Sequence, residues 1–251
     1  MNIAFKGRNV VVAGGSRGIG RSIALAFATA GANVSICARG AEALRATEQE
    51  LRAGSRQSQG TVFAAACDLA DGPAVKAYVE SAAVALGGID VLVNNASAFG
   101  RSDDEAGWAA SIGVDLMAPV RASYAALPFL EKNGGSIVHI AALAGLRPSV
   151  RTPPYGAIKA AIIQYTRTQA AQYAPKKIRV NCVAPGPIYF KGGTWDLNRR
   201  EKPELYQHVL ARCPFGRMGT PEEVANVALF LASDAASWVT GQTIAVDGAL
   251  A

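Results

Sequence analysis

The 251-residue sequence has few of the residues that bind metals or form disulfides. It contains only four cysteines and two histidines. They are widely separated, and no two cysteines stand in a C-x-x-C pair: Cys37, Cys67, Cys182, Cys213, His139 and His208. This spacing predicts no metal site.

The sequence also lacks a long apolar segment. Residues 1–8 contain no apolar core of signal-peptide length. The longest apolar runs end before a membrane span of about 20 residues is complete. We therefore expect a cytoplasmic protein with reduced thiols and no membrane partner.

A concentrated block of charge is missing as well. Lysine and arginine number 25 against 19 acidic residues, which gives a net charge of +6 and mildly favours anionic partners. The largest basic cluster is more typical of a solvated loop or helix face: Lys191, Arg199, Arg200 and Lys202. Without a basic stripe studded with aromatic residues, we expect no nucleic-acid partner.

Short apolar runs alternate with amphipathic stretches along the whole chain. Strands are expected at 9–15, 33–38, 61–69, 89–96, 135–142, 178–186 and 242–248. Helices are expected near 20–32, 41–54, 73–86, 104–131, 154–174 and 221–232. The alternation predicts an α/β, doubly wound (Rossmann) fold, with a seven-stranded parallel sheet and helices on both faces.

The length suits a single domain over residues 1–251. One long stretch, residues 186–221, has no clear periodicity. It follows the carboxyl end of a predicted strand, where open α/β sheets bind ligands. We expect a substrate lid over about residues 187–220.

Three glycines, Gly14, Gly18 and Gly20, lie between the first predicted strand and the first predicted helix. Such a turn lets the backbone approach a pyrophosphate and directs the free amides of the helix N-terminus at it. The spacing G-x-x-x-G-x-G differs from the G-x-G-x-x-G fingerprint, and an ordinary packing turn can look the same. The loop indicates a dinucleotide site without proving one.

The end of the second strand indicates which dinucleotide. An NAD site normally has an acidic residue about 20 residues after the glycine loop, on the ribose 2′-hydroxyl. Here Ala38 is followed by Arg39, and Arg17 in the glycine loop can reach the same place. Two guanidinium groups favour a 2′-phosphate, and so NADP(H) over NAD(H). The alternative is that both are ordinary surface arginines.

Tyr155 and Lys159 are four residues apart in a predicted helix, and therefore on one face. A phenol beside an ammonium group can donate or accept a proton, since the cation favours the phenolate. The alternative is a core tyrosine beside a solvated lysine.

Six motifs occur in order: "GGSRGIG" from Gly14, "CDLAD" from Cys67, "NNA" from Asn94, Y-x-x-x-K from Tyr155, "RVNCVAPG" from Arg179, and "VTGQTIAVDG" near the end. Together they resemble the short-chain dehydrogenase/reductase family, of the type that includes the 3-oxoacyl-carrier-protein reductases. The resemblance extends over essentially the whole chain. It implies an oxidoreductase for a small-molecule substrate that assembles as a homodimer or homotetramer through its fourth and fifth helices.

The resemblance also implies roles for single residues. Asp68 and Leu69 are expected at the adenine, and Lys159 at the nicotinamide ribose hydroxyls. The expected cofactor-binding set is Gly14, Ser16, Arg17, Gly18, Ile19, Gly20, Arg39, Asp68, Leu69, Asn94, Ala96, Tyr155, Lys159, Pro185, Gly186 and Ile188. The expected substrate pocket is mostly apolar and aromatic: Ala142, Leu143, Ala144, Pro187, Tyr189, Phe190 and Trp195, with Phe99 nearby.

Three positions depart from the family pattern. The serine expected thirteen residues before Tyr155 is Ala142, an asparagine in the fourth helix is Asp115, and a threonine beside the carboxamide is Phe190. Losing one positioned hydrogen-bond donor costs about 10² to 10³ in rate, by analogy with oxyanion holes. The charge of Asp115 opposes the Tyr155 phenolate and favours Tyr155 as a proton donor.

Two nearby hydroxyl side chains are candidates to replace the missing serine hydroxyl. Thr152 and Ser149 are close enough in sequence to turn a hydroxyl toward the gap. His139 lies inside a predicted strand and is more typical of a hydrogen-bonded core histidine.

The sequence therefore predicts an NADPH-dependent oxidoreductase that reduces a carbonyl, or another polarised double bond, with Tyr155, Lys159 and Asp115 as catalytic residues. The alternative is an NADP(H)-binding sensor or scaffold without turnover.

Overall fold

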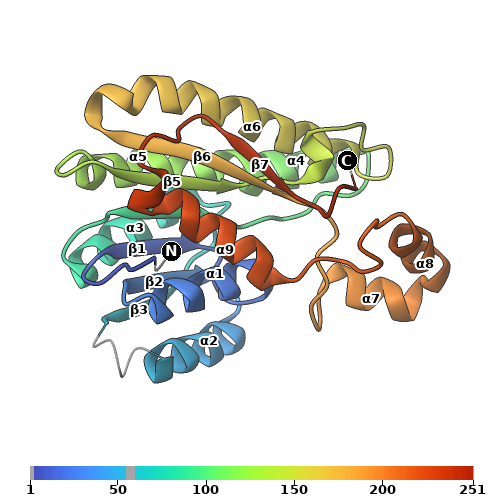
Figure 1. The fold of residues 1–251 in the computed structure, drawn as a ribbon, viewed down its shortest axis with the longest axis horizontal. Coiled ribbons are helices and arrows are strands. Elements are labelled where there is room, and N and C mark those ends of the chain that lie inside the picture. Colours follow the sequence, from blue (N-terminus) through green and yellow to red (C-terminus); the bar gives the residue numbers. More distant parts are fainter. Residues whose placement is uncertain (1–2, 55–59, 251) are drawn as a thin grey trace.

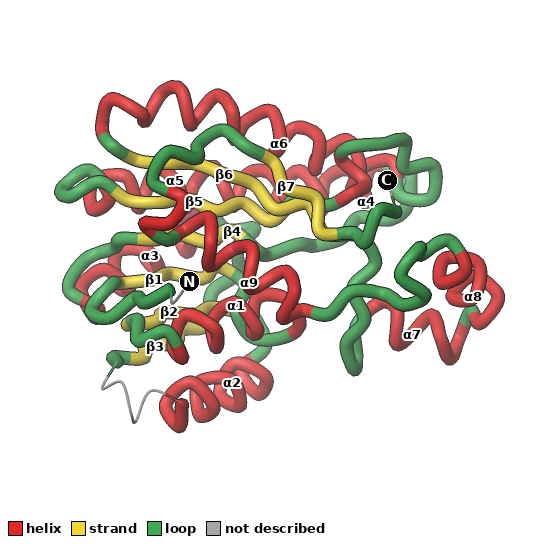
Figure 2. Tube along the Cα trace, viewed as in Figure 1, coloured by secondary structure: helices red, strands yellow, loops and turns green. Residues whose placement is uncertain are grey.

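A single parallel β-sheet runs through the computed structural model, which describes residues 3–54 and 60–250. Its strands are β1 (Asn9–Ala13), β2 (Asn33–Ala38), β3 (Val62–Ala66), β4 (Val91–Asn94), β5 (Gly135–Ile140), β6 (Ile178–Pro185) and β7 (Thr243–Val246). The seven strands lie in the order β3-β2-β1-β4-β5-β6-β7 (Figures 1 and 2; β4 is labelled in Figure 2). All neighbours pair in parallel, so every carboxyl end lies at one edge, and the winding reverses between β1 and β4. The predicted fold class is confirmed.

Helices cover both faces of the sheet (Figures 1 and 2). One face carries α1 (Gly18–Thr29), α2 (Ala41–Gly54) and α9 (Pro221–Ala232), and the other carries α3 (Gly72–Leu86), α5 (Ala118–Leu130) and α6 (Pro153–Tyr173). Each face has its own apolar core. Phe27 and Leu231 are fully buried in the first core, and Leu130 and Tyr173 in the second. These continuous apolar strands are typical of a sheet covered on both sides.

The predicted fourth helix is present and includes a π-helical segment. It consists of α4 (Glu105–Ala110), the π-helical residues Ser111–Met117 and α5, with no break between them. Asp104 begins α4 as its N-cap, where its Oδ1 accepts from the Gly107 amide at 2.8 Å. The expected helix over 104–131 is confirmed to within one residue at each end, and its π-helical part, which the sequence did not indicate, carries the buried carboxylate of Asp115.

The stretch expected to be irregular contains two helices, α7 (Thr194–Glu201) and α8 (Pro203–Ala211). Figure 1 shows them set apart from the helices that cover the sheet. Asp196 organises the start of α7, because its carboxylate accepts from the Tyr189 hydroxyl at 2.9 Å and from the Gly192 amide at 2.8 Å. These bonds hold the pKa of Asp196 below its usual value.

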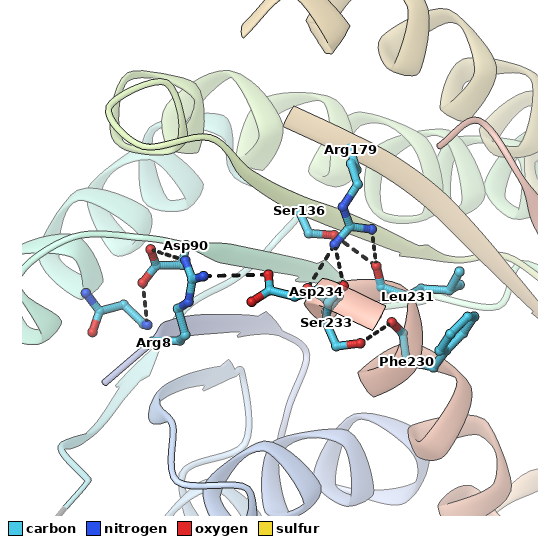
Figure 3. Close-up of polar contacts among 10 residues, drawn as sticks. Arg8, Asp90, Ser136, Arg179, Phe230, Leu231, Ser233 and Asp234 are labelled. Atoms are coloured by element: carbon cyan, nitrogen blue, oxygen red, sulfur yellow. Dashed lines mark hydrogen bonds and ion pairs between the residues drawn. The ribbon is translucent and has the colours of Figure 1, made fainter. Parts of the chain in front are cut away.

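Two arginines tie the molecule together at the amino edge of the sheet (Figure 3). Arg8 lies 3.5 Å from a carboxylate oxygen of Asp90 and 3.7 Å from one of Asp234. Arg179, at the start of β6, donates to the carbonyls of Leu231, Ala232, Ser233 and Val239. Because the last carbonyls of α9 have no partner within the helix, the guanidinium satisfies groups that burial would otherwise leave unpaired.

None of the helices in the described ranges is both long enough and apolar enough to cross a membrane.

Candidate active site

Lys159 lies in the interior at the carboxyl edge of the sheet. Its side chain comes from α6 and is 2% exposed. Gly145 allows this placement, since a Cβ there would lie 2.6 Å from the Lys159 carbonyl carbon. The turn after β5 therefore packs directly on the backbone of α6. The ammonium donates to the Ile140 carbonyl at 3.1 Å.

Asp115 is the counter-ion of Lys159. Its Oδ1 lies 3.1 Å from the lysine Nζ, and its Oδ2 accepts from the Ala98 amide at 3.1 Å. The Asp115 side chain is fully buried. Each charge of this buried ion pair depends on the other, because a single unpaired charge at this depth would destabilise the folded protein.

The pair controls two proton affinities. Burial lowers the pKa of Lys159, but the attraction of Asp115 outweighs it, so the pKa is raised overall. Burial raises the pKa of the Tyr155 phenol, Lys159 lowers it, Asp115 raises it again, and the net shift is upward. The structure therefore holds a protonated phenol beside a protonated amine at neutral pH.

Tyr155 stands beside Lys159 on α6, with the ammonium 5.4 Å from the centroid of its ring. The edge-to-face partner of this ring is Phe99, at a centroid distance of 4.7 Å and an interplanar angle of 86°. Phe99 has a φ of 53°, a left-handed conformation that is rare for an aromatic residue. Such strain is often found at functional sites.

The position of the missing serine is occupied by Ala142, which is 7% exposed at the end of β5. The Ser149 and Thr152 hydroxyls bond to each other at 2.8 Å. Ser149 also lies against Gly156, which is three residues before Lys159 and on the same face of α6. That either hydroxyl replaces the missing one stays a prediction.

The glycine loop fits a pyrophosphate group. Helix α1 begins at Gly18 with no side-chain cap and no acidic residue in its first turn, so its first amides lack acceptors within the helix. Gly14 and Gly18 have φ values of 89° and 52°. The ring of Phe190 lies directly on Gly18, where a Cβ would be 2.4 Å from its Cζ. The loop and the lid therefore touch at this point.

Arg17 and Arg39 are both exposed near the carboxyl ends of β1 and β2. Within residues 3–54 and 60–250, neither guanidinium has a carboxylate partner. Asp68 lies after β3 and accepts from the Ala70 amide at 3.0 Å, while Leu69 is buried. These placements suit an adenosine with a 2′-phosphate, and the donors are those that a phosphate requires.

Asn94 lies in the sheet, 4% exposed, rather than in an open cleft. Its Nδ2 donates to His139 Nδ1 at 3.3 Å, and His139 Nε2 bonds Gln169 Oε1 at 2.8 Å. Burial lowers the pKa of His139 to about 4, so the ring is neutral. His139 is the hydrogen-bonded core residue that the sequence indicated. Ala96 lies next to Gly14.

Three of the seven expected pocket residues lie in one apolar cluster. It joins the turn after β5 to α7 and α8, and it includes Leu143, Tyr189 and Trp195. At the end of β6 Pro185 is buried, and after it Gly186 donates to the Val246 carbonyl at 2.9 Å and Ile188 bridges to Gly219. The Pro187 carbonyl accepts from the Gly219 amide at 2.9 Å.

Ala144 is separate from this cluster. It lines a groove of about 570 Å³ between the loop after β5 and α6, together with Arg147, Ser149 and Gly156. Neither Tyr155 nor Lys159 lines that groove.

The sequence did not reveal the backbone groups that fix the charged pair. The Ile140 carbonyl and the Ala98 amide belong to ordinary apolar residues, and no residue type signals such a role. Arg101, which packs on Phe99, was also missed. In the described residues, no three histidine, cysteine or carboxylate side chains gather as a metal site.

Comparisons with known proteins agree with this geometry. A family model described as enoyl-(acyl carrier protein) reductase matches residues 13–250. The 3-oxoacyl-acyl-carrier-protein reductase FabG of Chlamydia trachomatis is 38% identical over 249 residues, covering 97% of each chain. The chain belongs to the short-chain dehydrogenase/reductase family.

Solved short-chain dehydrogenase/reductase structures have the same fold. A 7α-hydroxysteroid dehydrogenase complexed with NADH and 7-oxo-glycochenodeoxycholic acid has a TM-score of 0.90 at 34% identity, covering 99% of this chain and 96% of that one. An NADPH-bound oxidoreductase of Pseudomonas aeruginosa, described as containing an atypical catalytic center, has a TM-score of 0.87 at 33% identity, covering 99% and 98%. The chain is therefore an oxidoreductase of this family.

Proposed function

We propose that this short-chain dehydrogenase/reductase is an NADPH-dependent reductase of a carbonyl, or another polarised double bond, in a small and largely apolar substrate. The observation that carries the proposal is the placement of Tyr155 and Lys159 on one face of α6, at the carboxyl edge of the sheet. The protonated phenol suits reduction, which requires a proton donor. When bound, NADPH supplies the hydride.

Each residue of the charged group has one task. Tyr155 donates its phenolic proton to the substrate oxygen. The ammonium of Lys159 has three N–H donors, of which two face Ile140 and Asp115, and the third is left for the nicotinamide ribose hydroxyls. Asp115 keeps the lysine charged, and its own negative charge opposes the phenolate. The site therefore favours proton donation over proton abstraction.

The preference for NADPH is supported by Arg17 and Arg39, two guanidinium groups that have no carboxylate partner among the residues that the structure describes. The relatives use either cofactor, since one neighbour is bound to NADH and another to NADPH. We expect the dissociation constant for NADPH to be at least about tenfold lower than for NADH, because charge-assisted bonds to the 2′-phosphate are strong.

Further features of the proposal concern the whole chain. Residues 187–220 are proposed to close over the substrate as part of a single domain of residues 1–251. The protein is proposed to act in the cytoplasm as a homodimer or homotetramer. Tyr124 on α5 is 59% exposed, as expected for a helix face that packs against another subunit.

The test combines binding and turnover. NADPH binding is measured by fluorescence titration, and its oxidation by absorbance with a broad panel of ketones and aldehydes. The wild type is expected to bind and oxidise NADPH, and Tyr155→Phe to lose at least about 10²-fold in kcat while its dissociation constant for NADPH changes little. Tight binding without oxidation across the panel would contradict the reductase and support a sensor or scaffold.

A further inference from the structure

A charged side chain packs on the aromatic ring that contacts Tyr155. Arg101, on the loop between β4 and α4, places its guanidinium carbon 4.7 Å from the centroid of the Phe99 ring. Phe99 in turn contacts the Tyr155 ring at 4.7 Å. The Phe99 ring therefore contacts both the guanidinium of Arg101 and the ring of Tyr155.

Arg101 also reaches the lid. Its Nη2 lies 3.4 Å from the Thr194 hydroxyl, at the start of α7. Trp195, the next residue, belongs to the apolar cluster that joins the lid to the end of β5. The guanidinium thus stands where the loop after β4 meets the start of α7.

No carboxylate neutralises this guanidinium within the described residues. Three acidic side chains in the neighbouring segments have other partners: Asp103 accepts from Trp108 Nε1, Asp104 caps α4, and Asp196 binds Tyr189, Gly192 and Arg200. An arginine that packs on an aromatic ring keeps its planar edge of N–H donors available. Such an edge matches a carboxylate in a bidentate arrangement.

The strained backbone of Phe99 links these observations. A phenylalanine at φ 53° is unfavourable, and the conformation persists only where surrounding contacts hold it. Here its ring contacts both Arg101 and Tyr155. The strain therefore accompanies a fixed position of the guanidinium relative to the phenol.

We propose that Arg101 is a specificity-determining residue that binds a carboxylate of the substrate, so that the preferred substrates are oxo-acids. This inference rests on the proposed reductase function and adds a substrate class to it. The apolar body of the substrate packs on the lid cluster, its carbonyl faces Tyr155, and its carboxylate faces Arg101.

The experiment compares pairs of substrates with the same skeleton, in which an oxo-acid is matched with its neutral carboxamide. Steady-state kcat and KM are measured for the wild type, Arg101→Gln, Arg101→Lys and the control Lys132→Gln. Lys132 also packs on a phenylalanine ring, at 5.8 Å, but it precedes β5 at the opposite edge of the sheet. The control therefore removes one positive charge and one cation–ring contact away from the cleft.

For the oxo-acid, Arg101→Gln is expected to lower kcat/KM by about 10- to 100-fold, mainly through KM, since a hydrogen bond to a charged group is lost. The carboxamide and the Lys132→Gln control should stay within about twofold of the wild type. Arg101→Lys should recover part of the loss, because it restores the charge but not the bidentate geometry. NADPH binding, measured by fluorescence, should be unchanged in all variants.

The outcomes separate the two proposals. Equal loss for the oxo-acid and the carboxamide, or no loss for either, would contradict the role of Arg101 while leaving the reductase intact. A wild type that binds NADPH but reduces neither member of any pair would contradict the reductase itself, and the inference with it.

Discussion

At the scale of the single residue, the buried carboxylate of Asp115 favours Tyr155 as a proton donor over Tyr155 as a proton acceptor. It raises the pKa of both Tyr155 and Lys159. In Asp115→Asn the repulsion of the phenolate is removed, so alcohol oxidation, which needs the phenolate, should begin at a pH about one unit lower. The pH profile of kcat/KM for alcohol oxidation by NADP⁺ measures this shift.

The control for this change is Asp234→Asn, which removes the same charge at the amino edge, where Asp234 lies 3.7 Å from Arg8. Its pH profile should match the wild type. A profile that is unmoved in Asp115→Asn would show that the carboxylate does not govern the phenol.

Ala142 provides a second prediction at this scale. Ala142→Ser restores a hydroxyl at the end of β5, and one positioned donor is worth about 10² to 10³ in rate in comparable sites. We expect the kcat for reduction of a small ketone to rise at least about tenfold. The change is measured by steady-state oxidation of NADPH.

Ala141→Ser is the matched control for Ala142→Ser, because neighbouring residues in extended chain face opposite sides. Ala141 packs with Ile162 and Cys182 instead. Its kcat should not rise. An equal effect of the two substitutions would mean that the hydroxyl acts through packing alone.

At the scale of the element, the carboxylate of Glu223 stabilises the first turn of α9. Glu223 Oε2 accepts from the Thr220 amide at 2.8 Å, and both of its oxygens receive donors from Arg217, at 3.0 and 2.6 Å. These bonds lower the pKa of Glu223 to about 2. Because the pKa of Glu223 is lower in the folded protein than its ordinary value of about 4.5, the carboxylate stabilises the fold above pH 4.5. This stabilisation is lost as the pH falls from 4.5 toward 2.

Glu223→Ala should lower the free energy of unfolding by about 1 kcal/mol at pH 7, a typical loss for a helix cap. Glu223→Gln, which keeps an acceptor for Thr220 but loses the ion pair, should cost less than about 1 kcal/mol because the pair is exposed to solvent. Urea unfolding at a series of pH values measures both. The difference between wild type and Glu223→Ala should shrink below pH 4.5, and a difference that persists at pH 2 would contradict the role of the carboxylate.

The elements that sequence patterns predicted well are the buried ones. The strand at Asn33–Ala38 and the helix at Ala41–Gly54 lie where their periodicity placed them. Short helices of the lid were missed, because α7 is polar and is held by the tertiary bonds of Asp196 rather than by an apolar stripe. The π-helical segment was missed for a similar reason, since its inward carboxylate is compensated by a lysine from another helix.

The sequence predicted those parts of the candidate site that consist of reactive side chains. Tyr155, Lys159 and Asp115 were all named from sequence, and the structure brings them together. What spacing alone did not show is that Asp115 contacts the ammonium directly, at 3.1 Å. Distances of this kind depend on how two helices meet, which no local pattern contains.

At the scale of the whole molecule, Arg179 joins segments that are distant in sequence. Four carbonyls at the end of α9 and before β7 share its guanidinium, and burial lowers its pKa. In Arg179→Lys a single ammonium replaces the guanidinium and cannot donate a hydrogen bond to all four carbonyls. We expect a loss of about 2–3 kcal/mol in the free energy of unfolding, because several buried carbonyls lose their partner.

The measurement is the midpoint of urea unfolding, with an unchanged slope. The dissociation constant for NADPH should stay within about twofold of the wild type. An unchanged midpoint would show that the carbonyls find other donors, and a large change in cofactor affinity would show that the two edges of the sheet are coupled.

Since all seven strands point the same way, the arginine clamps and the proposed chemistry occupy opposite rims of one sheet. Substitutions at the carboxyl rim can therefore be chosen without changing the contacts of Arg8 and Arg179 at the amino rim. The loops at the carboxyl rim can be redesigned for new substrates. The amino rim is kept unchanged, because its contacts stabilise the fold and most substitutions elsewhere lower that stability.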